Sequence, residues 1–182
     1  MRGYSILPVF TAVLFASAAA AEPASYSGYQ TRSIKALSSE EIAELEAGRG
    51  MQFALAAELN HYPGPSHILT VSDELRLSDE QRAATSGIFQ RMEDAAKSAG
   101  RDLIAAEERL NRAFSEALVT EAALTALVDD AAELRGGLRR IHLAAHLETR
   151  SLLTPEQIQT YDRLRGYGDA ERKERQPGNG HN

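Results

Sequence analysis

The sequence predicts an all-α protein built on a long antiparallel helical hairpin with short flanking helices. Three observations lead to this fold class. Helix-start signals recur along the chain, two long segments each carry one apolar stripe at helical spacing, and no segment alternates apolar and polar residues as a half-buried strand does. Two helices with one apolar stripe each must bury those stripes against each other. Because such a hairpin is thin, we expect it to dimerise or to bind partner proteins.

Residues 1–21 are expected to direct export and then to be removed. Arg2 follows the amino terminus, the residues from Gly3 to Ala21 carry no charge, and the run ends in alanines before Glu22. A positive start, an apolar centre and a small-residue end describe a secretory signal peptide. The alternative is an uncleaved membrane anchor, since the uncharged run is long enough to span a bilayer.

The remaining chain divides into three predicted segments. Residues 22–36 show no periodicity and are expected to be a flexible leader, while residues 37–167 form one helical domain. Residues 168–182 are charged and poor in apolar side chains, so they are predicted to be a disordered tail.

Three helix starts share one pattern, in which an apolar residue precedes Ser or Thr and Glu or Gln follows three positions later. The hydroxyl residue is an N-cap, and the Glu or Gln completes a capping box by accepting a hydrogen bond from the cap's own backbone N–H. The three copies are Leu37-Ser38-Ser39-Glu40-Glu41, Leu77-Ser78-Asp79-Glu80-Gln81 and Leu153-Thr154-Pro155-Glu156-Gln157. They predict helices that begin after residues 38, 78 and 154.

Short helices are expected before and after the hairpin. The helix after Ser38 should break or loosen at Gly48 and Gly50, and a helix should resume over residues 51–59. Residues 61–65 form a turn, and residues 67–75 form another short amphipathic stretch. The last helix is predicted to end near Arg165, with Gly166 as its stop.

The first long helix is predicted over residues 79–116. Its small or apolar residues recur at steps of four, four and three, a repeat near 3.67 residues per turn that favours a nearly straight stripe. Gly87 and Gly100 either loosen this helix or permit a close approach. The stripe consists of Ala84, Ile88, Met92, Ala95, Ala99, Leu103, Ala106, Leu110, Phe114 and Ala117.

The second long helix opens at Val119-Thr120, and its stripe follows the alternating steps of three and four found in heptads. Glu148 is the one polar interruption, and Gly136-Gly137 predicts a bend or a tight packing point. The stripe consists of Leu124, Leu127, Ala131, Leu134, Leu138, Ile141, Ala145, Glu148 and Leu152.

Composition argues against several classes of protein. The chain has 20 Lys and Arg against 26 Asp and Glu, which gives a net charge of −6. Removal of the signal segment takes away Arg2, so 19 basic residues remain and the net charge becomes −7. This negative charge disfavours nucleic acid as a partner. Absence of cysteine excludes disulfides and thiol chemistry. The sequence contains no G-x-S-x-G elbow, no G-x-G-x-x-G and no P-loop. We therefore expect a binding protein and not an enzyme.

Histidines supply the one candidate for metal chemistry. His142 and His146 stand four residues apart on one predicted helix, close enough to share a divalent transition metal such as zinc. His67, His61 or a second subunit would have to complete the ligand set. The alternative is that both histidines lie at the border of core and solvent. The HLAAH pattern lacks the glutamate base of a zinc protease.

Charge is unevenly distributed. Residues 73–133 have a net charge of −7, whereas residues 135–175 have a net charge of +3 and include a cluster of Arg135, Arg139 and Arg140. This cluster is either a solvated helix face or a surface that steers acidic segments of partners. The paired carboxylates Glu107-Glu108 and Asp129-Asp130 are interpreted as solvated faces.

The elements LSDEQ at 77–81 and LTPEQ at 153–157, with the long hairpin between them, resemble the LTxxQ family. This family includes the CpxP and Spy periplasmic stress proteins and is related to zinc-resistance-associated and heavy-metal resistance proteins. The likeness covers residues 38–167, and Ser in the first copy keeps the capping hydroxyl. The motif residues Leu77, Ser78, Gln81, Leu153, Thr154 and Gln157 are interpreted chiefly as a helix-start device, with direct contact to a partner as the alternative.

The resemblance implies a thin, curved, dimeric protein of the periplasm that binds unfolded or partly folded envelope proteins. It also implies a membrane sensor protein as a possible partner and a response to zinc, copper or nickel. Two functions therefore stay open, a chaperone-like stress protein and a heavy-metal binding or sensing protein. A purely structural spacer of the envelope is a third alternative.

Overall fold

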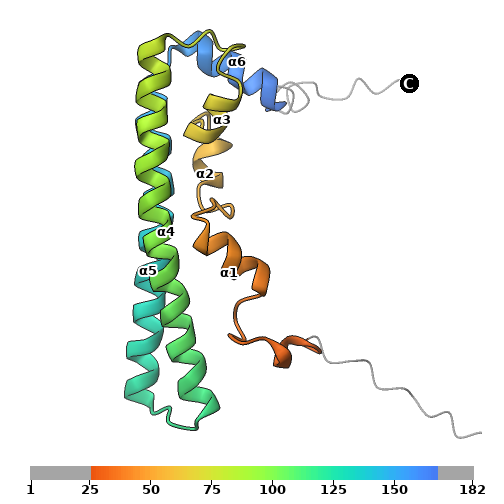
Figure 1. Ribbon diagram of the computed structural model, residues 1–182, viewed down its shortest axis with the longest axis vertical. Helices are drawn as coiled ribbons and strands as arrows, with labels where there is room; N and C mark the ends of the chain where they lie inside the picture. The colour runs from red at the N-terminus through yellow and green to blue at the C-terminus, as the bar shows by residue number, and fades with distance from the viewer. Residues whose placement is uncertain (1–25, 168–182) are drawn as a thin grey trace, which may run out of the picture.

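The computed structural model describes residues 26–167, and all regular structure within that range is helical. Two long helices, α4 (Asp79–Ser115) and α5 (Glu121–Ser151), lie side by side as an antiparallel hairpin (Figure 1). The short helices η1 (Tyr29–Thr31), α1 (Ser39–Glu46), α2 (Leu55–Glu58) and α3 (Pro65–Thr70) follow one side of the hairpin. Helix α6 (Pro155–Arg165) lies at its open end, opposite the α4–α5 loop. The predicted all-α hairpin is confirmed.

The predicted signal segment (residues 1–21) and tail (residues 168–182) lie outside the described residues. Between residues 26 and 167, no helix combines the length and apolarity that a bilayer crossing requires. The predicted leader is described from residue 26, and part of it packs: Ile34 is only 5% exposed, and the Lys35 backbone N–H donates to Asn111 Oδ1 at 3.2 Å. The packed chain therefore begins before residue 37.

Local capping signals set most helix boundaries. Ser38, Ser78 and Thr154 each accept a hydrogen bond from the third helical backbone N–H, and all three capping boxes are complete. The Thr120 side chain caps α5. Helix α6 ends at Gly166, which adopts a left-handed conformation with φ of 75°. These boundaries confirm the predicted starts and the predicted stop.

The short helices before the hairpin are shorter than predicted. The helix expected over residues 51–59 covers only Leu55–Glu58, because Met51 and Gln52 have positive φ angles of 38° and 63° that no helix accommodates. The stretch expected at 67–75 is helical from Pro65 to Thr70, and Pro65 occupies the first turn, where its missing N–H costs nothing.

Helix α4 buries two faces, whereas the sequence predicts one stripe. Ile88, Leu103 and Ala106 on that stripe are buried, but so are Thr85, Ala96 and Gly100 beside it. Ala84, Ala95 and Phe114, which the stripe includes, are exposed. The physical reason is that α5 packs on one side of α4 while α1 and α3 pack on another.

Gly100 marks the closest approach between α1 and α4. A Cβ added to Gly100 would lie 2.2 Å from the backbone carbonyl oxygen of Leu45, a separation that no side chain tolerates. Of the two interpretations offered by the sequence, close approach is therefore the correct one at Gly100.

The buried face of α5 drifts away from the predicted heptad stripe. Ala131, Leu138 and Ala145 are buried as predicted, but Glu148 is exposed and pairs with Arg91 at 2.8 Å, and the neighbouring Thr149 is buried instead. A helix with 3.6 residues per turn rotates about 20° per heptad away from a strict 3.5 repeat. Helices α2 and α3 also contact α5 and cover part of the additional face.

Gly136 and Gly137 interrupt nothing in α5. The helix runs unbroken through both positions. A Cβ at Gly136 would meet no atom within 4 Å, and one at Gly137 would meet only the end of the Arg140 side chain at 3.8 Å. The tight packing point predicted here is wrong.

Candidate functional site

The two L-[ST]-x-x-Q elements meet at the open end of the hairpin. Gln81 Nε2 donates to Gln157 Oε1 at 2.9 Å, and Gln157 Nε2 donates to Gln81 Oε1 at 3.0 Å. Gln81 Nε2 also donates to the Leu152 carbonyl oxygen at 2.7 Å, and Gln157 Nε2 to that of Leu75 at 3.3 Å. The two helix starts are thus joined by a reciprocal pair of amides.

Each glutamine also closes its own capping box. The Oε1 atoms accept the backbone N–H of Ser78 at 3.0 Å and of Thr154 at 2.9 Å. A glutamine offers both an acceptor and a donor, whereas a glutamate offers only acceptors when ionised. The capping box at Ser38 uses Glu41 instead of a glutamine, and it is not paired with a second capping box.

The motif leucines anchor this arrangement in a small core. Leu77 is 6% exposed and packs in a cluster with Ile68, Leu75 and Tyr161, and Leu153 is packed against the same cluster. All six predicted motif residues therefore hold the starts of α4 and α6 together. Their direct contact with a partner stays a prediction.

A buried carboxylate, Glu58, forms a second polar centre that no pattern in the sequence indicates. Glu58 is 6% exposed. The Tyr161 hydroxyl donates to its Oε1 atom, the Tyr167 hydroxyl donates to the same atom at 3.1 Å, and the Gly64 N–H donates to Oε2 at 3.2 Å. Glu58 therefore joins α2, the turn before α3, and the end of the helical domain.

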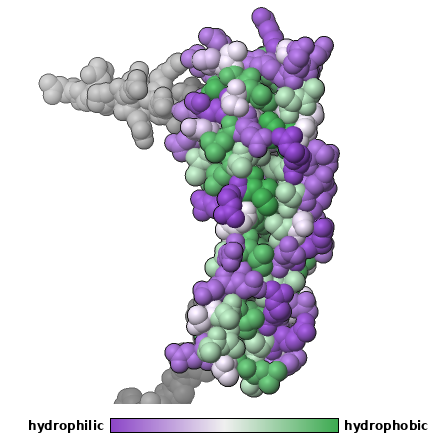
Figure 2. All heavy atoms as spheres, turned by 90° about the vertical axis from the view of Figure 1, so that its left-hand side faces the viewer, coloured by the Kyte–Doolittle hydropathy of each residue, from purple (hydrophilic) through white to green (hydrophobic). Residues whose placement is uncertain are grey.

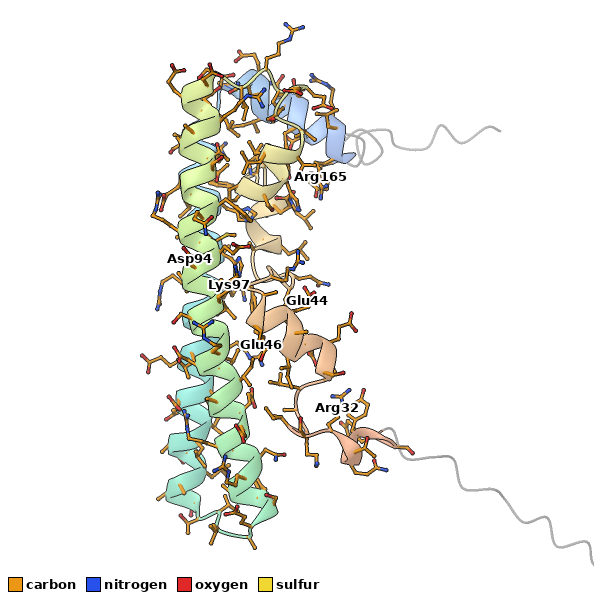
Figure 3. All side chains as sticks on the ribbon, viewed as in Figure 1. Arg32, Glu44, Glu46, Asp94, Lys97 and Arg165 are labelled. Carbon is orange, nitrogen blue, oxygen red and sulfur yellow. The ribbon has the colours of Figure 1, made fainter. Side chains whose placement is uncertain are left out.

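Cationic and titratable groups surround Glu58. Its carboxylate oxygens lie 3.3 Å from His67 Nδ1, 3.8 Å from His146 Nδ1 and 3.7 Å from Arg165 Nε. Figure 3 shows Arg165 at the end of α6, on the side of the molecule where α2 and α3 lie. Burial alone raises the pKa of Glu58, but hydrogen bonds from His67 and the tyrosines outweigh it and lower that pKa to about 2. Burial, and then the hydrogen bond to Glu58, raise the pKa of Tyr161.

His142 and His146 are both buried, at 2% and 8% exposed, so their predicted position at the border of core and solvent is wrong. His142 stacks on Phe53 with ring centroids 6.1 Å apart, and its Nε2 atom has no hydrogen-bond partner within residues 26–167. Burial, and then the charge of His146, lower the pKa of His142. His146 Nδ1 lies 2.6 Å from the Tyr62 carbonyl oxygen, and a Cβ on Gly64 would touch the His146 ring at 3.0 Å.

The three predicted metal ligands do not converge on one point. His67 and His146 both face Glu58, whereas His142 faces Phe53, because each ring is held by different neighbours. His61 instead contacts Asp162 Oδ2 at 2.7 Å. In the part of the chain that the structure describes, no group of three or more His, Cys, Asp or Glu residues is placed to hold a metal ion.

The arginine cluster divides into a structural and a free part. Arg135 pairs with Glu107 at 3.3 Å across the hairpin, and Arg109 and Asp130 form a second such pair. Arg139 and Arg140 are exposed and form no ion pair with any residue between 26 and 167. Glu107 and Asp130 therefore link α4 and α5, which corrects their interpretation as purely solvated carboxylates.

Comparison with known proteins gives one family. The model of the LTXXQ motif family protein matches residues 65–165, which is more than half of the chain and runs from α3 to the end of α6. No curated protein and no solved structure matches the chain. The matched range contains both glutamine elements and the whole hairpin, and the relation to CpxP and Spy is consistent with it. The chain therefore belongs to the LTXXQ motif family.

Proposed function

We propose that this protein is an exported stress protein of the CpxP/Spy type, which binds unfolded or partly folded envelope proteins in the periplasm. It acts by contact and not by catalysis. Membership of the LTXXQ motif family supports a periplasmic stress or metal-resistance role in general. The more specific proposal of client binding rests on the surface of the hairpin.

The observation that carries the proposal is an apolar patch at the hairpin tip. Phe114, Leu118, Leu124 and Val128 are 56%, 67%, 37% and 44% exposed. Helices α2 and α3 lie along the other half of the hairpin and leave this end uncovered (Figure 1). Figure 2 shows hydrophobic residues along the length of this face, including its lower end, flanked by hydrophilic ones. Contiguous apolar side chains that a monomer leaves in water are typical of a protein-binding surface.

The energy available at the tip suits reversible binding. Covering one fully exposed leucine or phenylalanine contributes roughly 1.5–3 kcal/mol, and these four side chains are only partly exposed. A client segment therefore gains several modest contacts instead of one deep pocket. A second copy of the chain is the other occupant we expect, and a homodimer that covers the tip would compete with clients.

An aggregation assay tests client binding. The chain from Glu22 onward is added in equal amount to a chemically denatured client, and light scattering is followed after dilution. We expect suppression of aggregation, weakened by Leu118→Ser and more so by Phe114→Ser with Leu118→Ser. The matched control is Leu164→Ser, since Leu164 is 48% exposed on α6, away from the tip. Absence of suppression across a range of salt concentrations rejects the proposal.

Export is tested separately. Cell fractionation should recover the protein in the periplasm, and intact mass measurement should give a chain that begins at Glu22. A cytosolic protein that retains Met1 would contradict this part of the proposal. Coupling to a membrane sensor protein, which the resemblance implies, is tested by cross-linking in intact envelopes.

Metal binding is the second candidate function, and one observation favours it. His67 and His146 flank the Glu58 carboxylate, so two of the three predicted ligands share one acidic neighbour. Titration calorimetry with zinc, copper and nickel tests this function. His67→Ala with His146→Ala should abolish binding, whereas His142→Ala should not. Wild-type affinity weaker than about 10 µM, or about −7 kcal/mol, would exclude a physiological site.

A further inference from the structure

An apolar hollow of about 460 Å³ lies between the loop before α2, α2 itself and α5. Its walls include Met51, Phe53, Leu55, Leu59 and Arg139. Leu55 and Leu59 are 45% and 52% exposed, so their side chains are open to water. Arg139 is the one charged side chain among the residues that line this hollow.

A second hollow of about 440 Å³ adjoins the first, because Met51, Gln52 and Leu55 line both. Its charged residues balance, since Arg49 and Arg165 stand against Glu44 and Glu58. Figure 3 labels Glu44 on α1 and Arg165 on α6, which approach this region from different ends of the chain. Together the two hollows form one open groove with apolar and charged walls, which suits an amphipathic polypeptide segment.

The loop between the two hollows has an unusual backbone. Met51 and Gln52 are consecutive residues without a glycine's freedom, yet both have positive φ angles, of 38° and 63°. Such conformations cost energy at each residue and concentrate at binding sites and other functional positions. Here they place both residues in the walls of both hollows.

We propose that this groove binds an acidic amphipathic segment of a partner protein. Apolar side chains of the segment pack on Leu55 and Leu59, and a carboxylate beside them pairs with Arg139. The inference rests on the proposed function, since the segment would belong to a client. The groove is thus a second client-binding surface besides the hairpin tip, and it selects acidic amphipathic segments.

Charge complementarity identifies the occupant. Arg139, which lines the first hollow, forms no ion pair within residues 26–167 and so offers a free positive charge there. Unpaired cations attract acidic segments at long range and reject basic ones. A second copy of this chain is the other occupant to consider, so self-association becomes an outcome of the test.

Peptide binding tests the inference directly. The chain contains no tryptophan, so fluorescence from one tryptophan in an amphipathic peptide reports the peptide alone. We compare a peptide carrying glutamates with otherwise identical peptides carrying glutamines or lysines. The glutamate peptide should bind about fivefold more tightly than the glutamine peptide. Binding should weaken as salt rises from low to physiological ionic strength.

Variants assign the binding to the groove. Arg139→Glu should weaken binding of the glutamate peptide at least about fivefold and reverse the preference toward lysine. Leu59→Ser should weaken all three peptides. The matched control is Arg101→Glu, an exposed arginine of α4 outside both hollows, and circular dichroism verifies that every variant stays folded.

The results separate this inference from the proposed function. Equal affinity for glutamate and lysine peptides, or an Arg139→Glu variant that binds like wild type, overturns the inference. So does sedimentation analysis in which Leu59→Ser and Arg139→Glu change only self-association. If wild type and both groove variants suppress aggregation equally, client binding stands and the groove is rejected. If wild type suppresses no aggregation, the proposed function itself fails.

Discussion

The side-chain amides of Gln81 and Gln157 explain at the scale of single residues why this family motif ends in glutamine. One end of each amide accepts the N–H of its own cap, and the other end donates across the interface between α4 and α6. A capping box alone would be served equally well by glutamate. The donor half is used because the amide of the other motif and the carbonyl oxygen of Leu152 or Leu75 lie opposite.

Replacing Gln157 with alanine should destabilise the protein by about 1–3 kcal/mol, because the Thr154 N–H loses its acceptor and the Leu75 carbonyl loses its donor. Urea unfolding followed by circular dichroism measures the loss. Gln159→Ala, an exposed glutamine of the same helix, should change stability by less than about 0.5 kcal/mol.

A double-mutant cycle isolates the amide pair itself. Gln81→Ala and Gln157→Ala should together cost less than the sum of the two single losses, with a coupling free energy of about 1 kcal/mol. Strict additivity of the two losses would show that the amides do not stabilise each other.

Glu58 makes stability depend on acid pH. Its folded pKa of about 2 lies below the ordinary value of 4.5, so its stabilising effect is complete above pH 4.5 and is lost as pH falls toward 2. The full effect is roughly 3 kcal/mol by the size of that shift.

Urea midpoints measured from pH 7 to pH 3 test this dependence. Glu58→Gln should be less stable than wild type at pH 7 and should lose less stability between pH 5 and pH 3. Glu44→Gln, which removes a carboxyl from the same hollow, serves as the control. An unchanged acid slope in Glu58→Gln would assign the pH dependence to other groups.

At the scale of elements, the closeness of α1 to α4 depends on Gly100. Gly100→Ala should destabilise the protein by about 1–3 kcal/mol or more, because the added methyl group meets the Leu45 backbone and not a flexible side chain. Gly136→Ala should stabilise it by up to about 1 kcal/mol, since its Cβ has open space and alanine favours helix.

Opposite signs for two chemically identical substitutions are the expected result, and thermal or urea midpoints measure both. A loss at Gly136 comparable with the loss at Gly100 would mean that helix α5 needs a glycine for a reason other than space.

The two long helices show where sequence periodicity is a sufficient guide and where it is not. Ile88, Leu103 and Leu138 lie on predicted stripes and are buried. The same patterns assign Phe114 to the core and His142 to its border, and both assignments are wrong. Periodicity identifies the side of each helix that packs against the other helix of the hairpin. It contains no information about the short helices α1 to α3, which cover another side of the hairpin and leave its tip exposed.

Viewed as a whole, the molecule has its cores at the middle and at the open end of the hairpin. One cluster gathers Ile34, Leu37, Leu45, Ala96, Leu103 and Leu138, and the other gathers Ile68, Leu75, Leu77 and Tyr161. No residue from 107 to 130 is buried, although ion pairs cross the hairpin there. Stability is therefore distributed unevenly along the long axis.

Hydrogen exchange should detect this gradient. Backbone amides of residues 112–128 should exchange faster than those of residues 85–106, because local opening of the tip exposes little buried apolar surface. Mass spectrometry of peptic fragments measures both ranges. Equal protection of the two ranges would indicate that another polypeptide covers the tip in solution. Loss of that protection in Phe114→Ser with Leu118→Ser would show that this polypeptide binds the apolar patch.

The sequence by itself determined the capped starts of α1, α4, α5 and α6, the stop of α6 at Gly166, the hairpin and the family motif. Those features depend on hydrogen bonds between residues at most four apart, or on one apolar face repeated over many turns. Only the tertiary structure decided that Glu58 accepts hydrogen bonds from Tyr161 and Tyr167, that Gln81 meets Gln157, and that His142 stacks on Phe53. Those partners are separated by about 75 residues or more, and their meeting depends on how three layers pack, which no local pattern encodes.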